Sequence, residues 1–248
     1  MEHVTVNFFR EDGIEAPVLV EGLPGVGHVG KLVADHLVDA LGGELVAEIY
    51  SLHFPPQVVV DECGVTHLVG NEIYRCEKDG KAILFLVGDF QSTSAEGHYI
   101  LTESYLDIAQ DLGVRRIYAL GGYGVGHLVE NPRVFSAVNM EHLRPEVEAA
   151  GGTFENAGTG GVIVGASGLL LGLGRVRGIE GICLMGETSG YIVDPMSADS
   201  LLSVLSNLLE IEVDHTFLQE RAEDMERAIE KIREAEEAKS QEELNYIG

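Results

Sequence analysis

Positive charge is scarce in this sequence, which has 16 Lys and Arg residues against 41 Asp and Glu residues and a formal net charge of -25. A nucleic-acid backbone requires a basic face that releases its counterions, whereas the field around this protein repels phosphate. Nucleic acid is therefore excluded as an expected partner. Only five of the basic residues are Lys. Such a composition indicates either a halophilic protein, whose self-repulsion is screened by concentrated salt, or simply an acidic protein.

Long apolar runs and paired cysteines are also missing. No stretch of some 18 apolar residues occurs, and residues 1–5 show no basic segment followed by an apolar one, so neither a membrane span nor an export signal is predicted. Cys63, Cys76 and Cys183 are odd in number and form no Cys-x-x-Cys pair, which argues against a disulfide framework or a zinc site. We therefore expect a cytoplasmic protein with no membrane partner.

Apolar runs and helical periodicities alternate along most of the chain. Runs bounded by Gly, Pro or Asp predict strands, and apolar residues at helical spacing predict helices. The strands are expected at residues 17–20, 44–50, 57–61, 65–75, 81–87, 115–120, 133–138 and 179–185, and the helices at 27–41, 96–112, 140–150 and 198–210. This order predicts an α/β fold with a mixed, largely parallel sheet flanked by helices. Asp79-Gly80 predicts a tight hairpin turn within it.

The C-terminal region differs from the predicted α/β core domain of residues 1–213. Residues 214–239 are dense in charge, and their apolar residues step by 4, 3, 4 and 3 along one helix face, which predicts a charged amphipathic helix. The members of this stripe are Leu218, Ala222, Met225, Ile229 and Ile232. The stripe packs either on its own domain or on another subunit. Residues 240–248 are predicted to be a flexible tail with an apolar end.

A glycine-rich segment from Glu21 to Lys31 follows a predicted strand and opens a predicted helix, where a phosphate cradle would lie. Gly25, Gly27 and Gly30 match Gly-x-Gly-x-x-Gly, and residues 25–31 match most of the phosphate-loop pattern. Leu32 stands where that pattern requires Ser or Thr. The alternative is that these glycines serve a tight turn and close packing.

Further glycine-rich segments follow other predicted strands and are interpreted as loops. They comprise residues 88–94, 121–126, 160–161, 165–172 and 186–191. Asp89 either acts as an acid, base or metal ligand or caps the next helix, with Ser92, Thr93 and Ser94 as rival caps. Loops at one sheet edge would form a shallow pocket lined with backbone N–H groups. The candidate ligand-binding residues are Gly25, Gly27, Gly30, Lys31, Asp89, Gln91 and Glu187.

No catalytic constellation emerges from these segments. The histidines show no metal-binding spacing, and Ser167 lacks the Gly-x-Ser-x-Gly frame of a nucleophile elbow. We therefore expect no catalytic residue, no metal and no cofactor. The alternative to a non-enzymatic binding protein is a small-molecule or nucleotide-binding enzyme that uses the glycine-rich loops.

Taken in order, five segments resemble the archaeal members of the proteasome assembly chaperone family, relatives of the second eukaryotic proteasome assembling chaperone. The segments are Glu21 to Lys31, Gly88 to Gln91, Gly121 to Tyr123, Gly165 to Gly172 and Gly186 to Tyr191. The resemblance covers roughly residues 15 to 210. It implies a nucleoside-phosphorylase-like fold, a homo-oligomer, and a chaperone or adaptor that binds proteasome α subunits or the α ring.

The resemblance also implies a role for the C-terminal tail. In family members that dock on the proteasome, a hydrophobic residue, a Tyr and any terminal residue enter pockets between α subunits. Here Tyr246 is third from the end and Ile247 second, so the pattern is displaced by one position. The implied partner-binding residues are Leu244, Tyr246, Ile247 and Gly248; the alternative is a frayed end without a partner.

Overall fold

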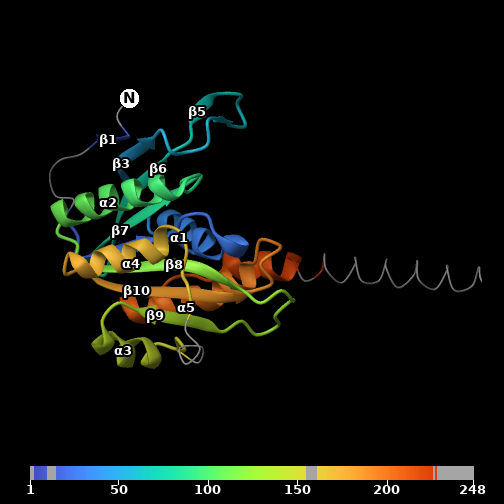
Figure 1. Ribbon diagram of the computed structural model, residues 1–248. Helices are drawn as coiled ribbons and strands as arrows, with labels where there is room; N and C mark the ends of the chain where they lie inside the picture. The colour runs from blue at the N-terminus through green and yellow to red at the C-terminus, as the bar shows by residue number, and fades with distance from the viewer. Residues whose placement is uncertain (1–2, 10–14, 155–160, 226, 228–248) are drawn as a thin grey trace, which may run out of the picture.

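The strands form a mixed sheet at the centre of the molecule (Figure 1). The computed structural model describes residues 3–9, 15–154, 161–225 and 227, and within them the main sheet has eight strands in the order β1-β3-β6-β7-β2-β8-β10-β9. The strands are β1 (Val4–Phe8), β2 (Val18–Glu21), β3 (Glu44–Ser51), β6 (Asn71–Lys78), β7 (Lys81–Gly88), β8 (Arg116–Gly124), β9 (Val134–Val138) and β10 (Glu180–Thr188). A separate hairpin of β4 (Val58–Val60) and β5 (Thr66–Leu68) projects from one corner (Figure 1).

Parallel pairing in the main sheet is confined to four adjacent strands, β7, β2, β8 and β10. β2 pairs in parallel with β7 and β8, and β8 pairs in parallel with β10, while the strands on both flanks are antiparallel. Asp79 and Gly80 join β6 to β7 with φ angles of 52° and 74°, the positive values that a two-residue hairpin turn requires. The predicted hairpin and the mixed α/β sheet are therefore confirmed, with the parallel part limited to these four strands.

Helices cover both faces of this sheet (Figure 1). They are α1 (Val29–Ala40), α2 (Ala95–Asp111), α3 (Arg144–Ala149), α4 (Ala166–Val176) and α5 (Pro195–Leu209), with short 3-10 turns η1 (Val26–His28) and η2 (Glu141–Leu143). Successive strand residues point to opposite faces. On β2, Val20 packs in the core with α1 and α5, whereas Leu19 packs with α2 and α4. No helix in the described part of the chain is long and apolar enough to span a membrane.

The interpretation of residues 165–172 as a loop is wrong, because α4 begins at Ala166. Leu170 and Leu171 are buried against the sheet, so apolar packing overrides the low helix propensity of the glycines. At Gly168 a Cβ would lie 2.1 Å from Ile163 O, so glycine lets the preceding chain pass close to the helix. The predicted strand at 65–75 is two strands, β5 and β6, and β1, which is partly exposed, was not predicted.

The chain after α5 begins a further helix on the same core. Residues 216–225 are helical, and Leu218 is fully buried in the cluster that contains α1 and α5. Phe217 stacks on His36 of α1 with ring centroids 5.8 Å apart. The predicted stripe therefore packs on its own domain at Leu218. The rest of the stripe beyond Met225 and the predicted tail lie outside the described residues, and the domain boundaries stay predictions.

Candidate functional site

The carboxyl ends of β2, β7, β8 and β10 meet at one edge of the sheet because these four strands run parallel. The glycine-rich motifs follow these ends. Gly22 N donates to Leu86 O at 3.0 Å, which joins the ends of β2 and β7. Val125 N donates to Thr188 O at 2.8 Å, which joins the ends of β8 and β10. Open α/β sheets bind ligands at this edge, so it is the candidate functional site.

The glycine pattern after β2 serves backbone geometry and close packing. Gly27 has a φ angle of 62°, which L side chains rarely adopt. At Gly30 a Cβ would lie 2.4 Å from Leu120 O of β8, so glycine lets α1 approach the sheet. Gly25 has extended backbone, and a Cβ there would meet only Leu23 O at 4.0 Å. Packing thus accounts for Gly27 and Gly30 but not for Gly25.

Gln91 ties three segments of this edge together. Its Nε2 donates to Pro24 O at 2.8 Å in the loop after β2, and its Oε1 accepts from Ala166 N at 3.0 Å at the start of α4. A Cβ on Gly165 would lie 2.6 Å from Gln91 Oε1. Both polar ends of the Gln91 amide are therefore engaged with the backbone, and the side chain positions loops.

Glu21 is fully buried at the end of β2. Its carboxylate accepts from Leu23 N at 3.1 Å and from Ser167 Oγ at 2.9 Å. Burial raises its pKa to about 7, because desolvation disfavours the charged form more than these two hydrogen bonds favour it. Glu21 is not among the site residues predicted from the sequence. The signal that could have found it is an acidic residue at the end of an otherwise apolar strand.

Lys31 and Asp89 line one cleft of about 370 Å³ beside this edge. The cleft is lined by α1, β3, β5, β6 and the end of β7, and its acidic members are Asp35, Glu48, Glu72 and Asp89. Lys31 Nζ lies 2.9 Å from Asp35 Oδ2. Burial raises the pKa of Asp35, although Lys31 opposes that change. Among the described residues, no group of three or more His, Cys, Asp or Glu side chains could hold a metal ion.

Asp89 does not cap the helix that follows it. Ser94 is the N-cap of α2, and its Oγ accepts from Gly97 N at 3.1 Å. Of the candidate capping residues in the sequence, Ser94 is therefore the one that caps α2. Asp89 lines the cleft instead.

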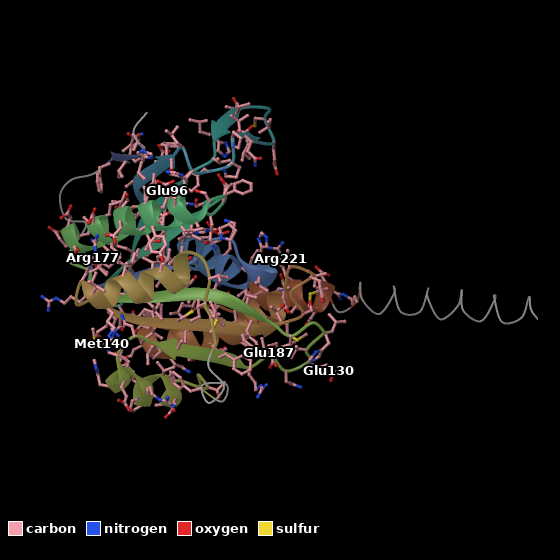
Figure 2. The ribbon with its side chains drawn as sticks, in the orientation of Figure 1. Glu96, Glu130, Met140, Arg177, Glu187 and Arg221 are labelled. Carbon is pink, nitrogen blue, oxygen red and sulfur yellow. The ribbon has the colours of Figure 1, made fainter. Side chains whose placement is uncertain are left out.

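Glu187 lies near the end of β10 (Figure 2) and is not among the residues that line this cleft. Its Oε2 lies 3.1 Å from Arg133 Nε and accepts from Arg133 N at 3.3 Å. The hydrogen bond from the Arg133 side chain lowers the pKa of Glu187. Glu187 therefore holds the start of β9 against β10.

The predicted pocket residues lie along one sheet edge, but only Lys31 and Asp89 line the same cleft. Gly27, Gly30, Gln91 and Glu187 have packing or positioning contacts, as described above. Ligand binding at this edge stays a prediction. The predicted partner-binding residues at 244–248 lie outside the described residues.

The model of the PAC2 family matches residues 19–233. An uncharacterized protein of Methanocaldococcus jannaschii is 40% identical over 244 residues, which covers 95% of this chain and 93% of that protein.

Solved structures from Pyrococcus furiosus share the fold over nearly the full length. PbaB, an archaeal proteasome activator, has a TM-score of 0.89 and 37% identity, covering 94% of this chain and 100% of its own. PbaA, an archaeal homolog of proteasome-assembly chaperone, has a TM-score of 0.77 and 26% identity, covering 97% of each chain.

Proposed function

This chain belongs to the PAC2 family, and we propose that it binds the proteasome as a homo-oligomeric assembly chaperone or activator. The resemblance inferred from the five glycine-rich segments is confirmed. The family also confirms the prediction of a non-enzymatic protein. The alternative of an enzyme that uses the glycine-rich loops is therefore set aside.

The full-length match to PbaB carries this proposal, because PbaB is a proteasome activator and its whole chain is covered. The match to PbaA supports the same partner. The two roles differ in their target, since an activator acts on the assembled particle and an assembly chaperone acts on its subunits. The higher identity to PbaB favours action on the assembled particle at its α ring.

The proposed anchor is the apolar end of the sequence. Leu244, Tyr246 and Ile247 follow a strongly charged segment, and an apolar segment on a polar tether can be captured in a pocket of a partner. Several copies held in one oligomer would raise the effective affinity without any new contact.

Native mass spectrometry tests the proposal on the full chain and on a chain truncated before Leu244. Each is mixed with proteasome α subunits and with assembled proteasome from the same source. We expect the full chain to bind and the truncated chain to lose binding. Peptide hydrolysis by the assembled proteasome and the rate of α-ring formation then separate the activator role from the chaperone role.

A matched pair of full-length variants controls for chain length. Tyr246→Ala should weaken binding at least about tenfold, as loss of an aromatic anchor does, while Asn245→Ala in the same segment should bind as the unchanged chain does. Binding by the truncated chain would place the interface on the α/β core. No binding by either chain would refute the proposed partner.

A further inference from the structure

Five exposed apolar side chains gather at the carboxyl edge of the sheet. They are Val26, Tyr123, Tyr191, Ile192 and Val193, here called the apolar platform. Tyr191 is 82% exposed, and the other four are between 38% and 48% exposed. Exposed aromatic and branched side chains in one place are typical of an interaction surface.

The platform is one surface, because hydrogen bonds join the three loops that bear it. Gly126 N donates to Ser189 O at 3.3 Å, which holds the loop after β8 beside the loop after β10. Asp194 N donates to Gly27 O at 3.0 Å, which holds the loop after β10 beside the loop after β2.

Val26 lies against the backbone of the two neighbouring loops. A Cβ on either Gly124 or Gly190 would lie 3.5 Å from Val26 Cγ1. These are ordinary contact distances, and they place Val26 beside the residues that neighbour Tyr123 and Tyr191 in the sequence. At Gly122 a Cβ would lie 2.2 Å from Val26 O, so this glycine of the motif lets the loop after β2 approach β8. This is a role for the motifs that needs no bound nucleotide.

The platform lacks acidic residues in a protein of net charge -25. Residues 22–34, 112–129 and 188–193 contain no Asp or Glu. Two flanking acids have internal partners: Glu187 pairs with Arg133, and Asp194 accepts from Thr188 Oγ1 at 2.7 Å and from Ser197 N at 3.0 Å. Glu130 directly follows the second range and is exposed, so the acid-free surface ends there. The ionisable side chains within these three ranges are basic or phenolic, namely His28, Lys31, Arg115, Arg116, Tyr118, Tyr123, His127 and Tyr191.

We propose that the apolar platform is the surface through which two copies of this chain bind each other. Two copies carry the same large negative charge, so they repel unless they approach through acid-free faces. A symmetric contact places the same patch on both partners, and an uncharged apolar patch complements itself. Tyr191, which is 82% exposed, supplies the largest aromatic area for the centre of such an interface, and Tyr123 adds the 38% of its surface that is exposed.

Self-association through the platform does not require the proteasome. Residues 216–225 lie at the same end of the molecule as the loop after β8 (Figure 1), and Figure 2 shows Arg221 and Glu187 at that end. Association through the platform would place this end of each copy beside that of its partner.

Sedimentation velocity over a range of protein concentrations tests the proposal without proteasome. Tyr191→Asp and Val193→Asp each place a negative charge in the platform, and both side chains are exposed enough that the fold should be preserved. The matched control is Val176→Asp, because Val176 is 84% exposed on α4. We expect each platform variant to raise the dissociation constant of self-association at least about tenfold, and the control to leave it unchanged.

Three results would overturn the proposal. One is a wild-type chain that stays monomeric at every concentration. Another is a pair of platform variants that associate as the wild type does. The third is a monomeric wild type whose binding to proteasome α subunits is lost in Tyr191→Asp, which would assign the platform to a different protein. Circular dichroism of each variant verifies that it is folded.

Cross-linking gives a second measurement that does not rely on weakening the contact. Cys63 is exposed, whereas Cys76 and Cys183 are buried, so Cys63→Ser removes the accessible thiol. In that background Tyr191→Cys should give a covalent dimer with a short bismaleimide, and Val176→Cys should not. Equal cross-linking at both positions would indicate random collision and contradict the proposal.

Discussion

Burial of Glu21 sets the chemistry of a single carboxyl group at the candidate site. The native state holds its proton up to a pKa of about 7, whereas the ordinary value is 4.5. Between these values the native state binds more protons than the unfolded chain does, so stability falls as pH rises through this window. Below about pH 4.5 the stabilisation by this group is complete, and above about pH 7 it is lost.

We predict that Glu21→Gln removes this pH dependence. Between pH 5 and pH 8 the variant should gain up to about 3 kcal/mol in unfolding free energy relative to the wild type, because the amide has no proton to lose. Denaturant unfolding of both proteins at both pH values measures this change. The other carboxyl groups contribute equally to both proteins, so their contributions cancel in the comparison. Ser167→Ala keeps the carboxyl group and should keep the pH dependence. If the unfolding free energies of wild type and Glu21→Gln differ by the same amount at pH 5 and pH 8, the pKa assigned to Glu21 is contradicted.

Gly30 and Gly172 both lie in helices, but replacing them by alanine is expected to change stability in opposite directions. A Cβ at Gly30 would lie 2.4 Å from Leu120 O, whereas a Cβ at Gly172 would meet no atom within 4 Å. We predict that Gly30→Ala costs about 1–3 kcal/mol of stability through overpacking. Gly172→Ala should stabilise by about 0.5–1 kcal/mol because alanine favours the helix. Thermal unfolding measures both changes, and a neutral Gly30→Ala would refute the packing role of that glycine.

At the scale of elements, α4 shows the limit of local sequence patterns. Glycines at 165, 168 and 172 indicated a loop, yet the leucines between them lie buried against the sheet. The helix forms because its apolar face is covered by the sheet and α2. Neighbours distant in the sequence, which no local window contains, decided its conformation.

The helix that begins at residue 216 depends on one buried anchor. We predict that Leu218→Ala destabilises the protein by about 2–5 kcal/mol, because it removes a fully buried side chain. Gln219→Ala, next to it on the exposed side, should change stability by less than about 0.5 kcal/mol. Chemical unfolding of both variants provides the comparison. Equal effects would show that the helix does not depend on this anchor.

At the scale of the whole molecule, net charge is the dominant feature. A charge of -25 opposes the compact state through self-repulsion, and dissolved salt screens that repulsion. The halophilic interpretation of the composition remains a proposal, and the salt dependence of stability tests it.

We predict that the melting temperature rises with KCl concentration at pH 7.5, by at least about 2 °C. The rise should be smaller at pH 5, near the isoelectric point of about 4.5, because less net charge remains to be screened. Differential scanning calorimetry at both pH values measures it. A rise of equal size at both pH values would point to a general salt effect on apolar burial, and no rise would count against salt adaptation.

The sequence by itself determined the fold class, the central strands and the hairpin at Asp79-Gly80. These follow from apolar periodicity and local φ preferences, which are properties of short segments. The ordered motifs also determined the family, because several of them occur in one order along the chain.

Only the tertiary structure decided what the motifs do. Glycine is required at position 30 because a strand some 90 residues away in the sequence passes close to it. Gln91 holds two loops that are distant in the sequence. The platform around Tyr191 forms where three loops meet. A glycine that cradles phosphate and a glycine that admits a neighbouring backbone are identical in sequence. They differ in which atoms approach the missing Cβ, and that depends on how the whole chain packs.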